Sequence, residues 1–296
     1  MLKRILTAAV GLALFLPTLF LSGRIPMLFI SVIAVLSFVA EYEICGCFGV
    51  RKALFISIPT YVFSLCVMGY VAYFTYFNIS TPNAGIIVAA IFAYLFVVFA
   101  GTMFSDGRAR FAQAASTVGA TIYALIGFVS IILIRYMASP GVFGFSINGF
   151  GLHRILLVFI GVWMTDSGAY FVGSALGKHK LIPAVSPHKT VEGAIGGIAG
   201  AIVGYVIYAL VLQLAFGIKV NYIYLVILAV VVSIIDQIGD LIASFMKREQ
   251  GIKDYGKIFP GHGGVMDRFD SSIAVAPAVF FITYFVNTPL FQIITE

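Results

Sequence analysis

Two carboxylates one helical turn apart interrupt an otherwise apolar stretch of the chain at 221–246. Asp236, Asp240, Ser244 and Lys247 follow one another at spacings of four, four and three residues. With about 3.6 residues per turn, this spacing places the four side chains on one face of a helix. A polar seam between helices needs only Ser and Gln, whereas two ionised carboxylates repel each other unless a cation lies beside them. The pattern therefore predicts a bound cation.

A third acidic residue, Asp166, lies within the apolar stretch 152–173. The small residues Gly168 and Gly173 follow it and predict close approach between helices. Packing accounts for the glycines but leaves the carboxylate unexplained. Because an ionisable side chain inside a membrane segment usually marks a functional site, we expect Asp166 to support the cation site.

The polar segment 174–190 leads into the sequence S-P-H-K-T-V-E-G, where an apolar stretch at 191–216 begins. Helix N-termini attract anions, and a Lys-Thr pair at such a place suits a phosphate group. The full G-x-x-x-x-G-K-[ST] pattern of a Walker A loop is absent. A helix start capped by Ser, Thr and Glu explains the segment equally well. Both interpretations concern Ser186, Lys189, Thr190 and Glu192.

The richest polar segment is the loop 247–272. Its carboxylates are ligands of the kind that Mg²⁺ prefers, and its lysines and arginines can neutralise phosphate charge. A glycine-rich turn can also direct backbone N–H groups toward a phosphate. His262 has no second His nearby, so we expect a structural role or a phosphate contact rather than zinc binding. The candidate residues of this loop are Lys247, Arg248, Lys253, Asp254, His262, Gly263, Gly264, Asp267, Arg268 and Asp270.

The composition indicates which solvent surrounds these segments. Hydrophobic residues make up 61% of the 296 residues and charged residues only 10%, and the mean hydropathy is +1.07. Soluble domains have about 45–50% apolar and about 25% charged residues, so a soluble fold is excluded. Apolar runs near the length of about 20 residues that a bilayer requires predict an all-α polytopic membrane protein with about nine transmembrane helices. The expected spans are 5–22, 25–41, 53–77, 84–103, 112–137, 152–173, 191–216, 221–246 and 273–294.

Lysines and arginines are distributed unequally between the two ends of these spans. Of the 18, only Arg24, Arg135, Arg154 and Lys219 fall on one side, and the other 14 fall on the opposite side. The positive-inside rule then predicts a cytoplasmic N-terminus, a C-terminus outside and both polar loops in the cytoplasm. We expect a multi-pass protein of a bacterial plasma (inner) membrane. Nucleic acid is not an expected partner, because no basic segment has the required pattern of aromatic residues.

The expected organisation has two parts. Residues 1–150 form N-terminal transmembrane helices, and residues 151–296 form a C-terminal catalytic region with the two polar loops. The first two spans are short, so whether both cross the membrane is left open. Cys45 and Cys47 are expected in a short loop after the second span, as reduced thiols rather than as a metal site, because no further ligands lie near them.

The polar motifs together resemble those of a known family. From Ser244 to Asp270 the chain reads S-x₂-K-R-x₄-K-D-x₅-P-G-H-G-G-x-x-D-R-x-D, which resembles the signature of CDP-diacylglycerol synthases (phosphatidate cytidylyltransferases). The runs D-S-G-A-Y-F-V-G at 166–173 and S-P-H-K-T-V-E-G at 186–193 are similar to further motifs of that family. His188 and Val191 stand where the family often has Lys and Trp. The resemblance covers roughly residues 160–273, and the first 150 residues match only in hydrophobic character.

The resemblance implies the reaction CTP + phosphatidate → CDP-diacylglycerol + pyrophosphate, with Mg²⁺ as cofactor and with membrane lipids as partners. We expect a phosphate oxygen of phosphatidate to attack the α-phosphorus of CTP in line, assisted by metal ions and fixed cations. A second, monovalent cation and a homodimer are left open. The expected metal ligands are Asp240 and Asp267, with Asp236, Asp166 and Asp270 around them and Lys247, Arg248, Lys253 and Arg268 on the phosphates. Further substrate contacts are expected from Ser186, Lys189, Thr190, Glu192, Ser244, Asp254, His262, Gly263 and Gly264.

Two other functions fit parts of the pattern. A CTP-dependent polyprenol kinase would use the same nucleotide but would transfer its γ-phosphoryl group to an alcohol, which needs a base, and would release CDP. A cation-coupled transporter would also use intramembrane carboxylates. Its site is expected near the bilayer midplane, whereas these carboxylates lie toward one interface. A purely structural scaffold leaves the carboxylates unexplained.

Overall fold

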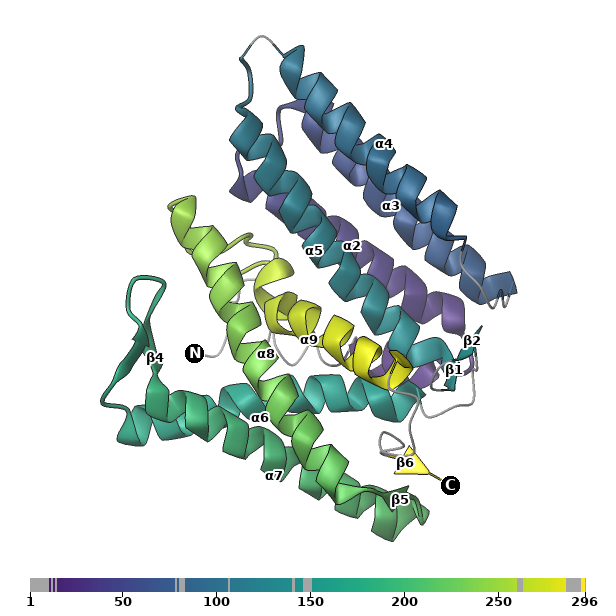
Figure 1. Cartoon of the computed structure of the whole chain (residues 1–296), viewed down its shortest axis with the longest axis vertical. Coiled ribbons are helices and arrows are strands. Elements are labelled where there is room, and N and C mark those ends of the chain that lie inside the picture. The colour runs from purple at the N-terminus through teal and green to yellow at the C-terminus, as the bar shows by residue number, and fades with distance from the viewer. Residues whose placement is uncertain are drawn as a thin grey trace.

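Long helices make up most of the computed structural model of the protein (Figure 1). The structure describes residues 11, 13, 15–77, 79, 83–105, 107–139, 142–145, 151–259, 263–285 and 294–295. The helices are α2 (Pro26–Cys47), α3 (Leu54–Phe77), α4 (Ala84–Met103), α5 (Phe111–Tyr136), α6 (Gly151–Leu176), α7 (Val191–Phe216), α8 (Tyr222–Glu249) and α9 (Met266–Phe285).

Seven helices of the described chain, α2 to α8, are long and apolar enough to cross a membrane. They confirm the predicted helical, multi-pass architecture, while the number of nine spans and the orientation of the termini stay predictions. Of the expected first span, 5–22, residues 15–21 are helical, and most of the others lie outside the described residues. The expected ninth span, 273–294, overlaps α9, and its residues 286–293 also lie outside the described residues.

Two boundaries differ from the prediction. Helix α2 continues to Cys47, so Cys45 and Cys47 lie buried in a helix and not in a loop. The second span was expected to end at 41, but the helix continues past it, and Glu41 and Glu43 are buried inside the protein. Helix α9 begins at Met266, ahead of the expected 273, so the acidic end of the 247–272 loop belongs to its first turns.

Three short antiparallel ribbons connect the helices. β1 (Met137–Ser139) pairs with β2 (Val142–Phe145), and β5 (Lys219–Val220) pairs with β6 (Ile294–Thr295). β3 (Lys180–Ile182) pairs with β4 (Ser186–Thr190), so the 174–190 segment contains a hairpin. In Figure 1 this hairpin and the C-terminal end of α8 lie on the left, and the other two ribbons lie on the right. The polar motifs therefore gather at one end of the bundle.

Glycines bring α6 and α7 into close contact along their length. A Cβ added to Gly168 would overlap the backbone oxygen of Gly196, and one added to Gly196 would overlap Val172. The prediction that small residues after Asp166 permit close helix approach is thus confirmed. This close contact fixes the position of α6, the helix that carries Asp166, against α7.

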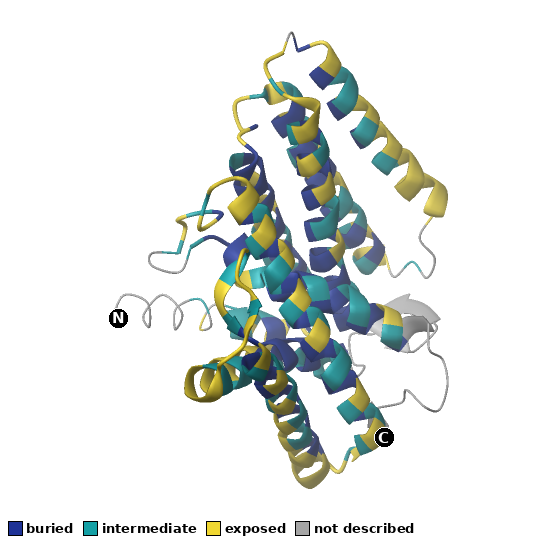
Figure 2. Ribbon diagram, turned by 60° about the vertical axis from the view of Figure 1, so that its left-hand side comes forward, coloured by how far each residue is buried: buried dark blue, intermediate teal, exposed yellow. Residues whose placement is uncertain are grey.

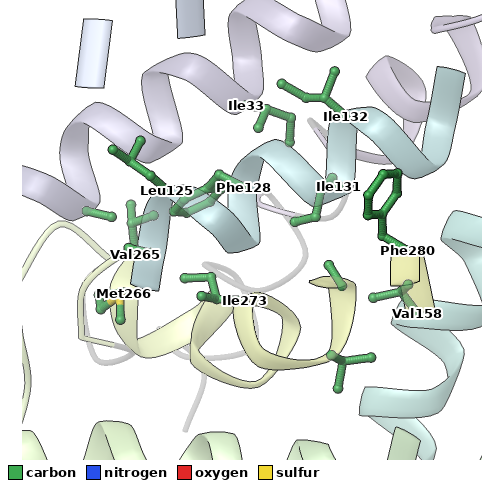
Figure 3. Packing of buried hydrophobic residues seen from close by; sticks show 14 of the residues in the cluster. Ile33, Leu125, Phe128, Ile131, Ile132, Val158, Val265, Met266, Ile273 and Phe280 are labelled. Atoms are coloured by element: carbon green, nitrogen blue, oxygen red, sulfur yellow. The ribbon is translucent and has the colours of Figure 1, made fainter. Parts of the chain in front are cut away.

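Helix α9 packs in the middle of the protein, against α5 and α6 (Figure 3). Ile273 and Phe280 of α9 face Phe128 and Ile131 of α5 in a buried apolar cluster. By contrast, most of α4 is not buried: its buried residues are Tyr94, Val98 and Thr102, and Figure 2 shows a largely exposed helix. Its exposed side chains are apolar, as expected of a helix that faces lipid.

Candidate active site

Three carboxylates and a lysine, from α6, α8 and β4, lie near one another at the polar end of the bundle. Lys189 at the end of β4 forms an ion pair with Asp240 of α8, with 2.5 Å between Nζ and Oδ2. Asp166 of α6 interacts electrostatically with Asp240 and Lys189, and Asp236 interacts with Asp166 and Asp240. The structure thus brings together the side chains that the sequence predicted to share a site. We call these four residues the carboxylate cluster.

Asp236 is the buried member of the carboxylate cluster, with 1% of its surface exposed. Neither of its side-chain oxygens has a well-formed hydrogen bond within the described structure, although Ser271 lies close and its hydroxyl donates to the Asp236 backbone oxygen at 3.4 Å. A buried carboxyl group without a partner is costly, so it commonly marks a place where a cation or a proton binds. The predicted cation site has its strongest support here.

Asp267, at the start of α9, has both carboxylate oxygens engaged. Oδ1 forms a buried ion pair with Lys247 of α8 at 2.7 Å. Oδ2 accepts hydrogen bonds from the backbone N–H groups of Tyr255 at 2.8 Å and Gly264 at 2.9 Å. These bonds join α8, the loop and α9 into one unit.

The glycine-rich turn fits tightly around this carboxylate. Gly263 has φ of 82°, in the left-handed region that favours glycine, and a Cβ there would come within 2.7 Å of Asp267 Oδ2. The turn was expected to direct N–H groups toward a nucleotide. In the structure the Gly264 N–H donates to Asp267 instead. The expected phosphate contact of this turn stays a prediction, and His262 lies outside the described residues.

Sequence reasoning missed Glu43, which comes from the N-terminal half of the chain. Its buried carboxylate accepts the backbone N–H groups of Val265 at 3.1 Å and Met266 at 2.9 Å, where α9 begins. A Cβ on Gly256 or Gly264 would overlap this carboxylate, so two glycines of the loop leave room for it. The rule that flags acidic residues inside membrane helices would have found Glu43 if α2 had been drawn to its full length.

Tyr255 fixes the middle of the loop. Burial raises the pKa of its phenol above the ordinary value, so the hydroxyl keeps its proton and donates to the Ala243 backbone oxygen at 3.1 Å. Lys247 Nζ lies 5.3 Å from the centre of its ring. The ring and the Asp267 carboxylate together hold the Lys247 ammonium group in place.

The residues predicted around the α7 start form a helix cap. The Thr190 side chain accepts the Gly193 N–H at 3.1 Å, and Glu192 accepts the Lys178 N–H at 3.1 Å and pairs with His179 Nδ1 at 2.6 Å. The capping interpretation is confirmed for Thr190, and Glu192 ties the helix start to the segment before β3. Ser186 lies in β4, and none of these contacts tests the expected phosphate contacts.

The other predicted residues lie around these two groups. Arg248 donates from Nη1 to the Ile252 backbone oxygen at 2.9 Å, and Ser244 is half-buried on α8. Asp270 accepts the Ser271 N–H at 2.9 Å and interacts electrostatically with Asp240, Asp267 and Lys247. It therefore lies between the carboxylate cluster and the Lys247–Asp267 pair. The exposed Arg268 interacts with Asp166, and Lys253 and Asp254 line a surface pocket.

Within the described residues no three His, Cys, Asp or Glu side chains converge as a metal site. The donors nevertheless fit Mg²⁺, which is usually held by one or two carboxylates while substrate phosphates and water complete its shell. Asp240 and the unbonded Asp236 have the required chemistry. For Asp267 a direct metal bond would require exchange of Lys247, so its role as a ligand stays a prediction.

Comparisons with known proteins agree with the motifs. A family model described as the cytidylyltransferase family matches residues 2–286. The phosphatidate cytidylyltransferase of Staphylococcus saprophyticus is 35% identical over 280 residues, which cover 93% of this chain and 95% of that protein. The protein of the same name from Staphylococcus aureus strain COL is 34% identical over 284 residues, with the same coverage. The resemblance of the motifs is confirmed, and the chain belongs to the cytidylyltransferase family.

Proposed function

We propose that this protein transfers the cytidylyl group of CTP to phosphatidate and so makes CDP-diacylglycerol for phospholipid synthesis. The match to relatives with this name over 93% of the chain is the observation that supports it most. The site adds chemical support, because carboxylates and lysines from four separate elements meet where apolar helices end. A lipid and a soluble nucleotide can meet only at such a boundary between membrane and water.

The proposed chemistry is an in-line substitution at phosphorus. A phosphate oxygen of phosphatidate forms a bond to the α-phosphorus of CTP, the bond from that phosphorus to the bridging oxygen breaks, and pyrophosphate leaves with the electron pair. The lipid phosphate is already ionised near neutral pH, so no protein base is required. The barrier comes from bringing polyanions together, which positioning and electrostatic stabilisation can lower.

The residues of the site have distinct proposed tasks. Lys189 and Lys247 are held by Asp240 and Asp267 and would present positive charge to the phosphates. Arg248 and Arg268 are exposed and would bind the same groups from the water side. We place Mg²⁺ at Asp240, with Asp236 and Asp166 beside it. Asp267 is the further ligand predicted from sequence, and a second, monovalent cation can accompany Mg²⁺ in this proposal. Bound there, the metal would neutralise charge that develops on the phosphates.

The proposed location is the plasma membrane, with the site facing the cytoplasm. The two relatives named above are bacterial, and seven helices of the described chain are apolar enough to span a bilayer. The positive-inside distribution supports a cytoplasmic site, since the 14 lysines and arginines of the richer side include those of both polar loops.

Purified protein in detergent tests the proposal through pyrophosphate release from CTP. Release should require CTP, phosphatidate and Mg²⁺ together, and it should fall sharply in Asp240→Asn and Asp267→Asn. Product analysis separates the alternatives, because a kinase would yield CDP and no pyrophosphate. Pyrophosphate release without lipid, or CDP as the product, would contradict the proposed reaction.

A further inference from the structure

A pocket of about 590 Å³ opens between the N-terminal half of the chain and the 247–272 loop. It lies beside Tyr255, whose backbone N–H donates to Asp267. One wall is the end of α2 with the turn after it, and the other is the loop segment 252–258. Pockets that hold small-molecule ligands have volumes of about 300–1,000 Å³.

The charges that line the pocket favour an anion. Arg51, Lys253 and Lys257 contribute three positive charges. Two acidic residues also line it: Asp254, and Glu43, whose two oxygens already accept backbone N–H groups. Three cations against two carboxylates leave the wall with a net positive charge, which suits a phosphate group.

Arg51 is positioned for binding before any ligand arrives. Its Nε donates to the Tyr42 backbone oxygen at 2.9 Å, and its guanidinium carbon lies 3.9 Å from the centre of the Tyr42 ring. Gly46 provides the space, since a Cβ there would overlap the guanidinium group. In the described structure neither terminal nitrogen of Arg51 has a hydrogen-bonded partner, so both N–H₂ groups can serve a ligand.

The pocket lies next to the proposed reaction centre. Tyr255 and Gly256 line it, and the Tyr255 N–H holds Asp267. In-line attack places the entering and leaving oxygens on opposite sides of the α-phosphorus. Since the phosphate of phosphatidate enters from the membrane, the leaving pyrophosphate must point away from it, toward residues outside the apolar spans such as Arg51 and Lys253.

We propose that this pocket binds the β- and γ-phosphates of CTP and then the pyrophosphate product, with Arg51 as their ligand from the N-terminal half. The inference rests on the proposed function. It gives the N-terminal helices a direct part in substrate binding, which the motifs of the C-terminal half did not predict.

The test uses full-length enzyme in detergent and measures KM for CTP, KM for phosphatidate and the inhibition constant of added pyrophosphate. Arg51→Ala should raise KM for CTP and weaken pyrophosphate inhibition, each by about tenfold or more, as expected for the loss of a charge-assisted contact. KM for phosphatidate should stay within about twofold. Gly46→Ala, which displaces the guanidinium group without removing it, should give a smaller change in the same two constants. Lys52→Ala is the matched control, because Lys52 is exposed in the same turn and does not line the pocket.

Each other pattern would overturn the inference. A higher KM for CTP with unchanged pyrophosphate inhibition would assign the pocket to the nucleoside end, and a higher KM for phosphatidate alone would assign it to the lipid headgroup. Unchanged constants in both Arg51→Ala and Lys253→Ala would leave the pocket without a role in binding. A wild-type enzyme that makes no pyrophosphate from CTP and phosphatidate would instead refute the proposed function itself.

Discussion

Replacement of Glu43 tests how the N-terminal half supports the active site. The Glu43 carboxylate accepts two backbone N–H groups at the start of α9, and Val265 and Met266, which donate them, are buried. Asp267 follows directly and holds Lys247. If Glu43 fixes this helix start, its removal should loosen Asp267 although the two side chains share no bond. We expect loss of both stability and turnover in Glu43→Ala.

The size of the effect follows from the bonds lost. A hydrogen bond to a charged group contributes about 1.5–3 kcal/mol, and a negative charge at a helix N-terminus adds about 0.3–1 kcal/mol. Two such bonds set an upper range of about 3–6 kcal/mol, and water that enters the gap will reduce it toward about 3 kcal/mol. Because about 1 kcal/mol shifts the melting temperature of a large domain by about 2–4 °C, Glu43→Ala should melt about 6–12 °C lower. Glu43→Gln keeps one acceptor oxygen and should lose about half as much.

Thermal unfolding in detergent and pyrophosphate release provide the assay. Gly264→Ala places a Cβ where the Glu43 carboxylate lies, so it should produce the same two defects. The double variant with Glu43→Ala should be little worse than either single variant, since both remove one interaction. The exposed Glu249 supplies the control Glu249→Ala. A Glu43→Ala enzyme with wild-type melting temperature and turnover would refute this reasoning.

Four further results are expected. Asp267→Asn leaves Lys247 buried without its partner, so it should destabilise the protein by about 3–5 kcal/mol in thermal unfolding, and Lys247→Met in the same chain should restore part of that loss. Lys189→Met should change the melting temperature little, because its ion pair with Asp240 is partly exposed, yet turnover should fall by about a hundredfold in the pyrophosphate assay. Chelation with EDTA should abolish turnover and Mg²⁺ should restore it, and in Asp240→Asn any residual activity should need a higher Mg²⁺ concentration. Gly196→Val should separate α6 from α7, lower the melting temperature by several degrees and lower turnover, because α6 carries Asp166.

The long helices were predictable because membrane spans obey one dominant rule. A bilayer requires about 20 apolar residues in a row, and hydropathy reads that requirement directly. The predicted spans 84–103 and 191–216 coincide with α4 and α7. The rule places a helix end too early where a distant part of the chain hydrogen-bonds a carboxylate inside the helix and buries it. Glu43 lies in such a place, so α2 was predicted too short.

Local spacing predicted part of the site, and tertiary contacts decided the rest. Helical periodicity was sufficient to place Asp236 and Asp240 on one face of α8. The ion pair of Asp240 with Lys189 joins residues that are far apart in sequence, and no periodicity connects them. The same limit applies to Asp267, whose partners come from a helix and a loop that only the folded chain brings together.

The 247–272 loop explains why the two halves of the chain depend on each other. Within the loop, the Asp267 carboxylate bonds Lys247 and two backbone N–H groups. From the N-terminal half, α2 contributes the Glu43 carboxylate, and the turn after α2 contributes Arg51. The division at residue 150 stays a prediction, but these contacts cross it. Because both halves of the chain hold the site, the sequences of both halves are constrained. This is the physical reason to expect family similarity over residues 2–286 and not only over the motifs from about 160 onward.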